Sequence, residues 1–147
     1  MQIRKATADD VPFMVAMLRD IHAARGYSDR GACIDEDNRR FLEHSMGTEG
    51  SYTAVAEQGG DVIGMLICCA SAAPFNSSSV VAYQQVCWVD PSHRRSGVGV
   101  GLLRHTEQWA RSIGARSIVS VTDDKPAEVV LKSNGYKTRE RCYWKAI

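Results

Sequence analysis

The stretch that decides the fold reads VDPSHRRSGVGVG and spans residues 89–101. An apolar run typical of a β-strand, residues 80–89, precedes it, and an amphipathic helical pattern with Leu102, Leu103 and Trp109 follows it. Glycines in such a strand-to-helix turn allow a tight backbone path and a close approach to a ligand. The helix start adds unpaired N–H groups and the positive end of the helix dipole. This combination predicts a binding site for a phosphate group, above all a pyrophosphate.

Two common phosphate-binding motifs do not fit this stretch. A Walker loop ends in Gly-Lys-Ser/Thr, and that triplet does not occur here. A dinucleotide fingerprint, G-x-G-x-x-G, requires a third glycine where Leu102 stands, and it follows the first strand of a parallel sheet. The pattern that fits is R-x-x-G-x-G, formed by Arg94, Gly97 and Gly99.

The R-x-x-G-x-G pattern resembles the pyrophosphate signature of the GCN5-related N-acetyltransferase (GNAT) superfamily. Residues 87–91, Cys-Trp-Val-Asp-Pro, are similar to the end of the strand that precedes this signature in the family. Residues 124–136 match the frame of the family's later motif, with Ala127, Gly135 and Tyr136 in register. The order of elements along essentially the whole chain also agrees with this superfamily.

The hydropathy pattern predicts an α/β fold built on a mixed sheet. Strands are expected at 1–6, 51–57, 62–70, 80–89, 117–121 and 136–145, and helices at 11–25, 35–46, 102–113 and 126–134. Hairpins followed by β-α-β crossovers call for a mostly antiparallel sheet with helices on both faces. The resemblance implies a GNAT-like acyl-CoA N-acyltransferase fold, with a sheet that splays at the cofactor cleft and a single acetyltransferase domain over residues 1–147.

Composition excludes several classes of partner. The chain has 147 residues with 18 basic and 17 acidic side chains, a net charge of +1, so we expect neither nucleic acid nor membrane as a partner. The cysteine count is odd and shows no ligand spacing, so reduced thiols and no metal site are expected. The first ten residues are polar, and no apolar run reaches about 18 residues, which predicts a cytoplasmic protein.

The resemblance implies acetyl-coenzyme A as the acyl donor and an amine, on a small molecule or a protein, as the acceptor. It assigns the coenzyme to Cys87, Trp88, Val89, Arg94, Arg95, Ser96, Gly97, Val98, Gly99 and Val100. Amides of residues 94–100 would hold the pyrophosphate, and the strand edge at 87–89 would pair with the pantetheine arm. The backbone N–H of Val89 would polarise the thioester carbonyl. The amine would enter from the opposite side, under the loops at 25–33 and 74–79.

The proton-transfer groups depart from the family pattern. Leu131 stands where the family carries its tyrosine general acid, and leucine cannot donate a proton. Tyr83, Tyr136 and Tyr143 are alternative donors, and each is also explained as an ordinary buried tyrosine. Asp124 occupies the family's asparagine position, where it serves as a base or ammonium ligand, or else caps the following helix, which is the favoured interpretation.

Other functions therefore stay open beside direct acetyl transfer. The strand before the phosphate loop has no glutamate to act as base, and no histidine is expected to be catalytic, which leaves ordered water. A non-catalytic coenzyme A-binding sensor or partner module is one alternative, favoured by Leu131. An acyltransferase that modifies a protein or another macromolecule is the other. A homodimer through the terminal segment, with Tyr143 and Trp144, is a further expectation, equally explained by core packing.

Overall fold

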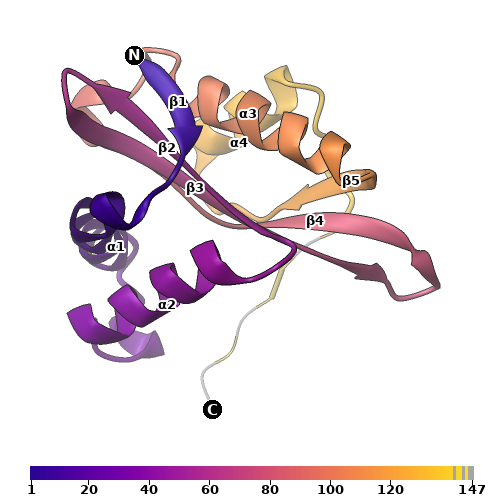
Figure 1. Ribbon diagram of the computed structural model, residues 1–147, viewed down its shortest axis with the longest axis horizontal. Helices are drawn as coiled ribbons and strands as arrows, with labels where there is room; N and C mark the ends of the chain where they lie inside the picture. Colours follow the sequence, from indigo (N-terminus) through magenta and orange to yellow (C-terminus); the bar gives the residue numbers. More distant parts are fainter. Residues whose placement is uncertain (141, 144, 146–147) are drawn as a thin grey trace.

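The computed structural model describes residues 1–140, 142–143 and 145. In chain order its elements are β1 (Gln2–Lys5), η1 (Ala8–Asp10), α1 (Val11–Arg25), η2 (Tyr27–Arg30), α2 (Asp35–Gly47), β2 (Ser51–Gln58), β3 (Asp61–Ala73), β4 (Asn76–Val89), η3 (Pro91–His93), α3 (Val98–Ser112), β5 (Ala115–Ser120) and α4 (Lys125–Ser133), as Figure 1 shows. The three η elements are single turns of 3-10 helix.

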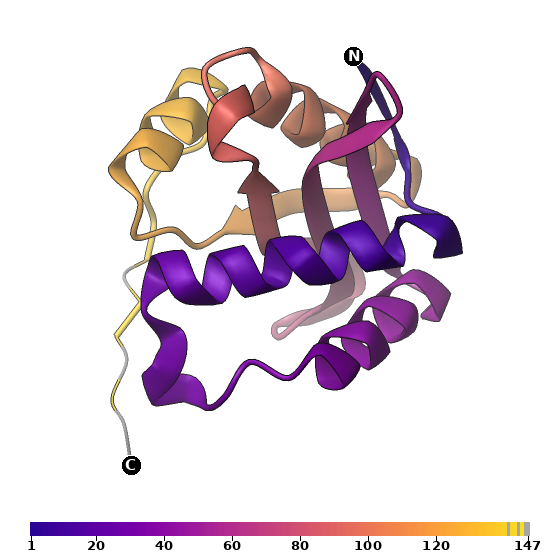
Figure 2. The ribbon, with the colours of Figure 1, turned by 90° about the vertical axis from the view of Figure 1, so that its left-hand side faces the viewer.

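The strands form one mixed sheet in the order β1-β2-β3-β4-β5. The pairs from β1 to β4 are antiparallel, and β4 pairs with β5 in parallel. Helices α1 and α2 cover one face of this sheet, while α3 and α4 cover the other (Figures 1 and 2). The predicted α/β mixed sheet with helices on both faces is confirmed.

Alternation along the strands builds a separate apolar core on each face. On β3, Met65 and Ile67 join the core beneath α1 and α2, whereas Leu66 and Cys68 join the core beneath α3. This two-sided burial explains why β3 reads as a continuous apolar run instead of an alternating one. The second core also takes in Ile3 near the N-terminus and Tyr136 after α4.

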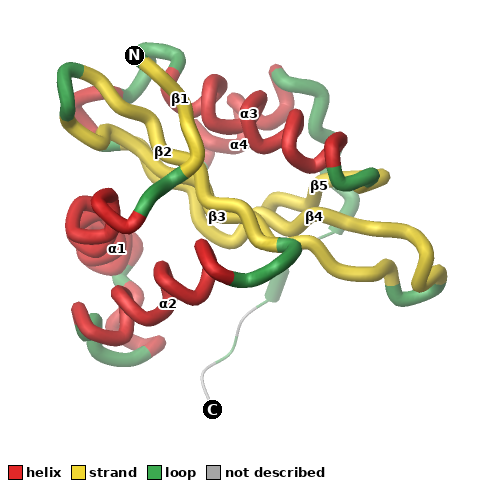
Figure 3. The backbone as a smooth tube through the Cα atoms, viewed as in Figure 1, coloured by secondary structure: helices red, strands yellow, loops and turns green. Residues whose placement is uncertain are grey.

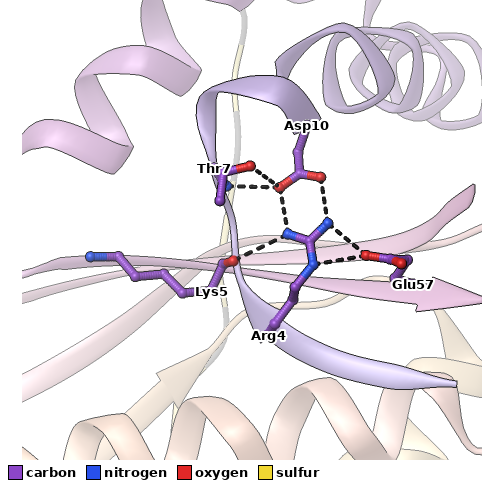
Figure 4. A network of polar contacts seen from close by, with 5 residues as sticks. All are labelled: Arg4, Lys5, Thr7, Asp10 and Glu57. Atoms are coloured by element: carbon purple, nitrogen blue, oxygen red, sulfur yellow. Dashed lines mark hydrogen bonds and ion pairs between the residues drawn. The ribbon is translucent and has the colours of Figure 1, made fainter. Parts of the chain in front are cut away.

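The entry into α1 is held by a buried carboxylate (Figure 4). The backbone N–H of Thr7 donates to Asp10 Oδ2 at 2.7 Å, which is the capping interaction that their spacing predicts. Arg4 donates to both oxygens of Asp10, at 2.7 and 2.8 Å, and to Glu57 on β2 at 2.8 Å. Strand β1, the start of α1 and strand β2 are therefore joined by one ion-pair network.

A glycine follows three of the expected helices, which predicts that each helix ends there, and the structure agrees. Gly26, Gly114 and Gly135 have positive φ values of 63°, 72° and 87°, after α1, α3 and α4 respectively. This left-handed backbone is favourable for glycine because it lacks a Cβ atom.

The structure corrects four local expectations. Asn76–Ser79 belong to β4 and not to a loop, because β3 and β4 pair almost to the hairpin tip. Helical spacing on α2 predicts that both Phe41 and Leu42 face inward, but Phe41 stays 37% exposed while Leu42 is buried. Residues 117–121 are predicted to form a buried strand, but β5 is mostly exposed or half-buried, since it forms a sheet edge. The expected strand at 136–145 is absent from its described residues, which Figure 3 draws as loop.

Candidate active site

The sheet opens between β4 and β5 beside the phosphate loop. Gln84 and Ser120 form the last pair between these strands, yet β4 continues to Val89. The Asp90 N–H donates to the Ile63 carbonyl on β3 at 3.0 Å. Because backbone groups alternate sides along a strand, the N–H and C=O of Val89 point the other way, toward the open edge. The same alternation turns those of Cys87 toward that edge.

The loop after β4 is shaped by short-range contacts. Asp90 accepts from the Ser92 N–H at 2.8 Å and also from the Ser92 hydroxyl, and these bonds hold the pKa of its carboxyl below the usual range. Arg94 donates through Nε to the Val89 carbonyl at 3.1 Å, with its guanidinium carbon 4.6 Å from the Trp88 ring centroid. Arg95 and Gly97 have positive φ values of 66° and 87°, so the chain reverses sharply before α3.

The start of α3 presents unpaired backbone donors. The Gly101 N–H donates to the Gly97 carbonyl at 2.9 Å, which is the first hydrogen bond of the helix. The N–H groups of Val98, Gly99 and Val100 precede that bond and have no partner within the helix. Together with the helix dipole, they form a site that favours an anion.

A cleft of about 1230 Å³ connects this loop to the opposite face of the sheet. Its walls come from α1, the segment after α1, the end of β4, the start of α3, the β5–α4 connection and α4. The lining residues are Leu18, Ile21, His22, Ala24, Arg25, Tyr27, Arg30, Ala32, Cys33, Asn38, Gln84, Gln85, Val86, Cys87, Trp88, Val89, Arg94, Arg95, Gly97, Gly99, Val100, Leu103, Val121, Thr122, Asp123, Asp124, Pro126, Ala127, Val129, Val130 and Leu131.

Most residues that the sequence assigned to the coenzyme line this cleft. The members in the lining are Cys87, Trp88, Val89, Arg94, Arg95, Gly97, Gly99 and Val100. Val98 instead turns its side chain into the core, where it is 1% exposed, and Ser96 donates its hydroxyl to the His93 carbonyl at 2.6 Å. Gly99 and Gly101 lie within α3 and not in the preceding turn, because the helix begins at Val98.

The side chains considered for proton transfer occupy different places. Tyr83 pairs with Val119 of β5, before the cleft opens. Tyr136 lines a separate hollow beside α3, and burial holds the pKa of its hydroxyl above the usual range. Tyr143 is 85% exposed. Leu131 lines the cleft at the position of the family's tyrosine, so the described cleft lining contains no tyrosine there.

Asp124 caps α4. Its Oδ2 accepts from the Ala127 N–H at 3.0 Å, and Pro126 lies in the first turn of the helix. This is the local role that the sequence favours for this carboxylate.

The wall opposite the phosphate loop contains an ion pair that sequence reasoning missed. Arg25, at the end of α1, pairs with Asp123 in the connection between β5 and α4. His22 donates to the Gly31 carbonyl over 2.9 Å, and the Arg30 guanidinium carbon lies 4.0 Å from the Tyr27 ring centroid. No local pattern signals a contact across 98 positions of the sequence. Residues 74–79, expected near the acceptor, do not line the cleft.

Cys87 is an exposed residue of the cleft lining, where the protein around it removes part of the water from its thiol. This desolvation raises the pKa of the Cys87 thiol to about 11. The thiol is therefore protonated at neutral pH and a poor nucleophile. We assign no covalent chemistry to it.

Among the described residues, no cluster of three His, Cys, Asp or Glu side chains is arranged to hold a metal ion. Within the same part of the chain, none of the helices has the length and apolar character needed to span a membrane.

Comparison with known proteins adds a family match. The model of the acetyltransferase (GNAT) family matches residues 15–136. A search of curated proteins finds no match. A solved probable acetyltransferase is 23% identical with a TM-score of 0.83, covering 100% of this chain and 98% of its own.

Two further solved structures contain coenzyme A derivatives. A predicted acetyltransferase from Clostridium acetobutylicum, solved with acetyl-CoA, is 18% identical with a TM-score of 0.78, over 98% of this chain and 94% of its own. AAC(6')-Iy, in complex with the bisubstrate analogue CoA-S-monomethyl-acetylneamine, is 18% identical with a TM-score of 0.81, over 98% and 95% respectively. At these identities the structural matches establish a common fold.

Proposed function

Because the chain belongs to the acetyltransferase (GNAT) family, we propose that it transfers the acetyl group of acetyl-coenzyme A directly to a primary amine. The observation that carries this proposal is the juxtaposition, in one cleft, of the open β4 edge and the unpaired amides at the start of α3. An extended amide-containing arm that ends in a pyrophosphate is complementary to that pair of features.

The backbone supplies the main contacts of the donor. The pyrophosphate accepts from the N–H groups of residues 98–100, with Arg94 and Arg95 in the same wall. The pantetheine arm pairs with the edge of β4 at Cys87. The N–H and C=O of Val89 both face the open edge, and Arg94 donates to the C=O. The N–H is therefore the Val89 group left for the thioester carbonyl, where it stabilises the negative charge of the transition state.

Acetyl transfer also requires two proton movements. An alkyl ammonium has a pKa of about 10.4, so water in the cleft removes a proton from the amine before attack. An ordinary alkyl thiol has a pKa of about 8.5, so the departing thiolate is a tolerable leaving group without an acid at Leu131. In this proposal most of the rate arises from holding the two reactants together.

Two further observations support the proposal. AAC(6')-Iy, which has the same fold, is solved in complex with a bisubstrate analogue that joins coenzyme A to an acetylneamine. The core beneath α3 extends from Ile3 to Tyr136, which supports a single acetyltransferase domain over residues 1–147. The second candidate function is a non-catalytic coenzyme A-binding module, favoured by Leu131 in the cleft wall.

Calorimetric titration with acetyl-coenzyme A tests the donor site, with Gly97→Glu as the disabling variant. Gly114→Glu is its matched control, because both glycines have positive φ (87° and 72°) and both have no atom within 4 Å of an added Cβ. Equal backbone strain therefore accompanies both variants, but only Gly97→Glu places a carboxylate beside the phosphates. Micromolar binding to the parent and to Gly114→Glu, lost in Gly97→Glu, supports the donor site.

Thiol release then separates the two candidate functions. Amine-dependent release of free coenzyme A by the parent supports the acetyltransferase. Binding of acetyl-coenzyme A without release for any amine supports the non-catalytic module. Failure of the folded parent to bind acetyl-coenzyme A refutes both.

A further inference from the structure

The open end of β4 has no neighbouring strand on the side of the cleft. The pairing with β5 stops at Gln84 and Ser120, and β4 continues alone to Val89 on that side. Such an edge leaves backbone N–H and C=O groups without the partners that hold a strand in place. A backbone donor that stabilises a transition state must nevertheless be fixed before the reaction begins. The end of β4 therefore needs another source of order.

The peptide group between Val89 and Asp90 is hydrogen-bonded at both of its ends. Its N–H, which belongs to Asp90, donates to the Ile63 carbonyl on β3 at 3.0 Å. Its C=O, which belongs to Val89, accepts from Arg94 Nε at 3.1 Å on the open side. Because a peptide group is planar, bonds at both ends fix its orientation. The Arg94 side chain thus bonds the carbonyl that a neighbouring strand would otherwise bond.

Arg94 is itself held against a rigid surface. Its guanidinium carbon lies 4.6 Å from the Trp88 ring centroid. Trp88 is 7% exposed and belongs to the core beneath α1 and α2, so its ring has little freedom to move. A guanidinium stacked by its face directs its N–H donors within its own plane, which suits the bond from Nε to the Val89 carbonyl.

We infer that Arg94 is a positioning residue for acetyl transfer, which replaces the missing strand partner of β4 and so fixes the direction of the Val89 N–H. The inference rests on the proposed acetyl transfer and gives Arg94 a role other than binding the pyrophosphate. The two roles need different chemistry. A phosphate can be bound by any well-placed positive charge, lysine included, whereas the bond to Val89 needs a stacked, planar donor.

Arg94→Lys separates these two roles. Lysine retains the charge but has neither the planar donor group nor the Nε position. We expect kcat to fall about ten- to hundredfold, since a misplacement of about 1 Å can cost about a hundredfold. The dissociation constants of acetyl-coenzyme A and of ADP, which has a pyrophosphate but no pantetheine arm, should change less than about twofold. Arg94→Met, which also removes the charge, should lose as much kcat as Arg94→Lys.

Arg104→Lys is the matched control. Arg104 lies on α3, is exposed and is outside the cleft lining, so kcat should equal that of the parent. Thermal unfolding of each variant confirms that it is folded. A kcat that Arg94→Lys leaves unchanged, or a main effect of Arg94→Met on ADP binding, would overturn the inference and identify Arg94 as a phosphate ligand.

Infrared spectroscopy of bound acetyl-coenzyme A with a ¹³C-labelled thioester carbonyl keeps the inference distinguishable from the proposed function. A hydrogen bond from the Val89 N–H lowers the stretching frequency of that carbonyl, and no turnover is needed to observe it. The shift should be lost in Arg94→Lys and kept in Arg104→Lys. That result supports the inference even if no amine is acetylated, which would refute only the transferase. An unshifted carbonyl in the parent, or a shift that survives Arg94→Lys, overturns the inference.

The contact that carries the inference is also measurable in the free protein. The nitrogen of Asp90 shares a peptide group with the Val89 carbonyl, so loss of the Arg94 bond in Arg94→Lys should move the Asp90 ¹⁵N resonance. The same resonance should stay in place in Arg104→Lys. An Asp90 resonance that Arg94→Lys does not move would overturn the inference, whether or not acetyl-coenzyme A binds.

Discussion

Replacing Gly64 by alanine tests how closely α3 must approach the sheet for the donor site to form. A Cβ atom at Gly64 would lie 3.1 Å from the Trp88 carbonyl oxygen, 3.2 Å from Val98 Cγ1 and 3.3 Å from Leu102 Cδ1. One of these neighbours is backbone and two belong to the first turns of α3. The added methyl group must therefore push α3 away from β3 or spread β3 from β4.

The expected cost is moderate. Overpacking of this kind costs about 1–3 kcal/mol, and alanine recovers about 0.5–1 kcal/mol over glycine in a strand. The net destabilisation is about 1–2 kcal/mol, which corresponds to a fall in Tm of roughly 2–8 °C for a chain of this size. Because Val98 begins α3, displacement of the helix should also weaken acetyl-coenzyme A binding by about fivefold, the equivalent of about 1 kcal/mol.

Thermal unfolding and calorimetry measure the two effects, with Gly47→Ala as the control. Gly47 is the last residue of α2, and an added Cβ there meets no atom within 4 Å. Alanine should therefore raise Tm by about 1–4 °C through its helix preference and leave the affinity unchanged. A Gly64→Ala protein as stable as the parent would refute the packing argument, and unchanged affinity in a destabilised protein would refute the link to the donor site.

Three other predictions concern Asp10, Asp124 and Cys87. The hydrogen bond from Arg4 is the main reason that the pKa of Asp10 is lowered in the folded protein. Ionised Asp10 therefore stabilises the protein above its unfolded pKa of about 3.9, and this stabilisation is lost as pH falls through the folded pKa. Asp10→Asn should cost about 2 kcal/mol at pH 7 and flatten the acid limb of a Tm–pH profile, and an unchanged limb would contradict this. Asp124→Ala should lose about 1 kcal/mol of stability because the helix cap is removed. Asp124→Asn should retain kcat within about twofold, because asparagine also caps a helix. A hundredfold loss of kcat in Asp124→Asn would instead identify Asp124 as a base. The pKa of the Cys87 thiol is about 11, so mass spectrometry should show alkylation at pH 7 about 300-fold slower than for a free thiol of pKa about 8.5. Bound acetyl-coenzyme A should slow the alkylation further. Rapid labelling of Cys87 would show that the thiol is not desolvated.

Local chemistry made much of this fold predictable from the sequence. Thr7 and Asp10 mark the start of α1 because a cap needs only residues three positions apart. Gly114 marks the end of α3 for an equally local reason, its left-handed backbone. Residues 89–101 could be predicted as a pyrophosphate-binding loop because such a site depends on a turn and a helix start, both encoded within this stretch.

Contacts between distant segments were not encoded in this way. The Arg25–Asp123 ion pair forms only because the end of α1 and the β5–α4 connection meet across the open sheet. The inward turn of Leu42, with Phe41 left 37% exposed, depends on how α2 sits against the sheet. Periodicity cannot distinguish two adjacent apolar residues until a neighbouring surface selects one of them.

The sequence by itself determined the family resemblance, the order of elements and the phosphate loop, because each depends on residues close together in the chain. Tertiary structure alone decided which strand edge stays open, that Val89 directs its N–H toward that edge, and which charges line the cleft wall opposite residues 89–101. These features arise where β4 extends beyond its last pair with β5 and where α1 crosses the opening between these two strands. The packing of segments that are far apart in the sequence sets these positions, so no short stretch of the sequence can predict them.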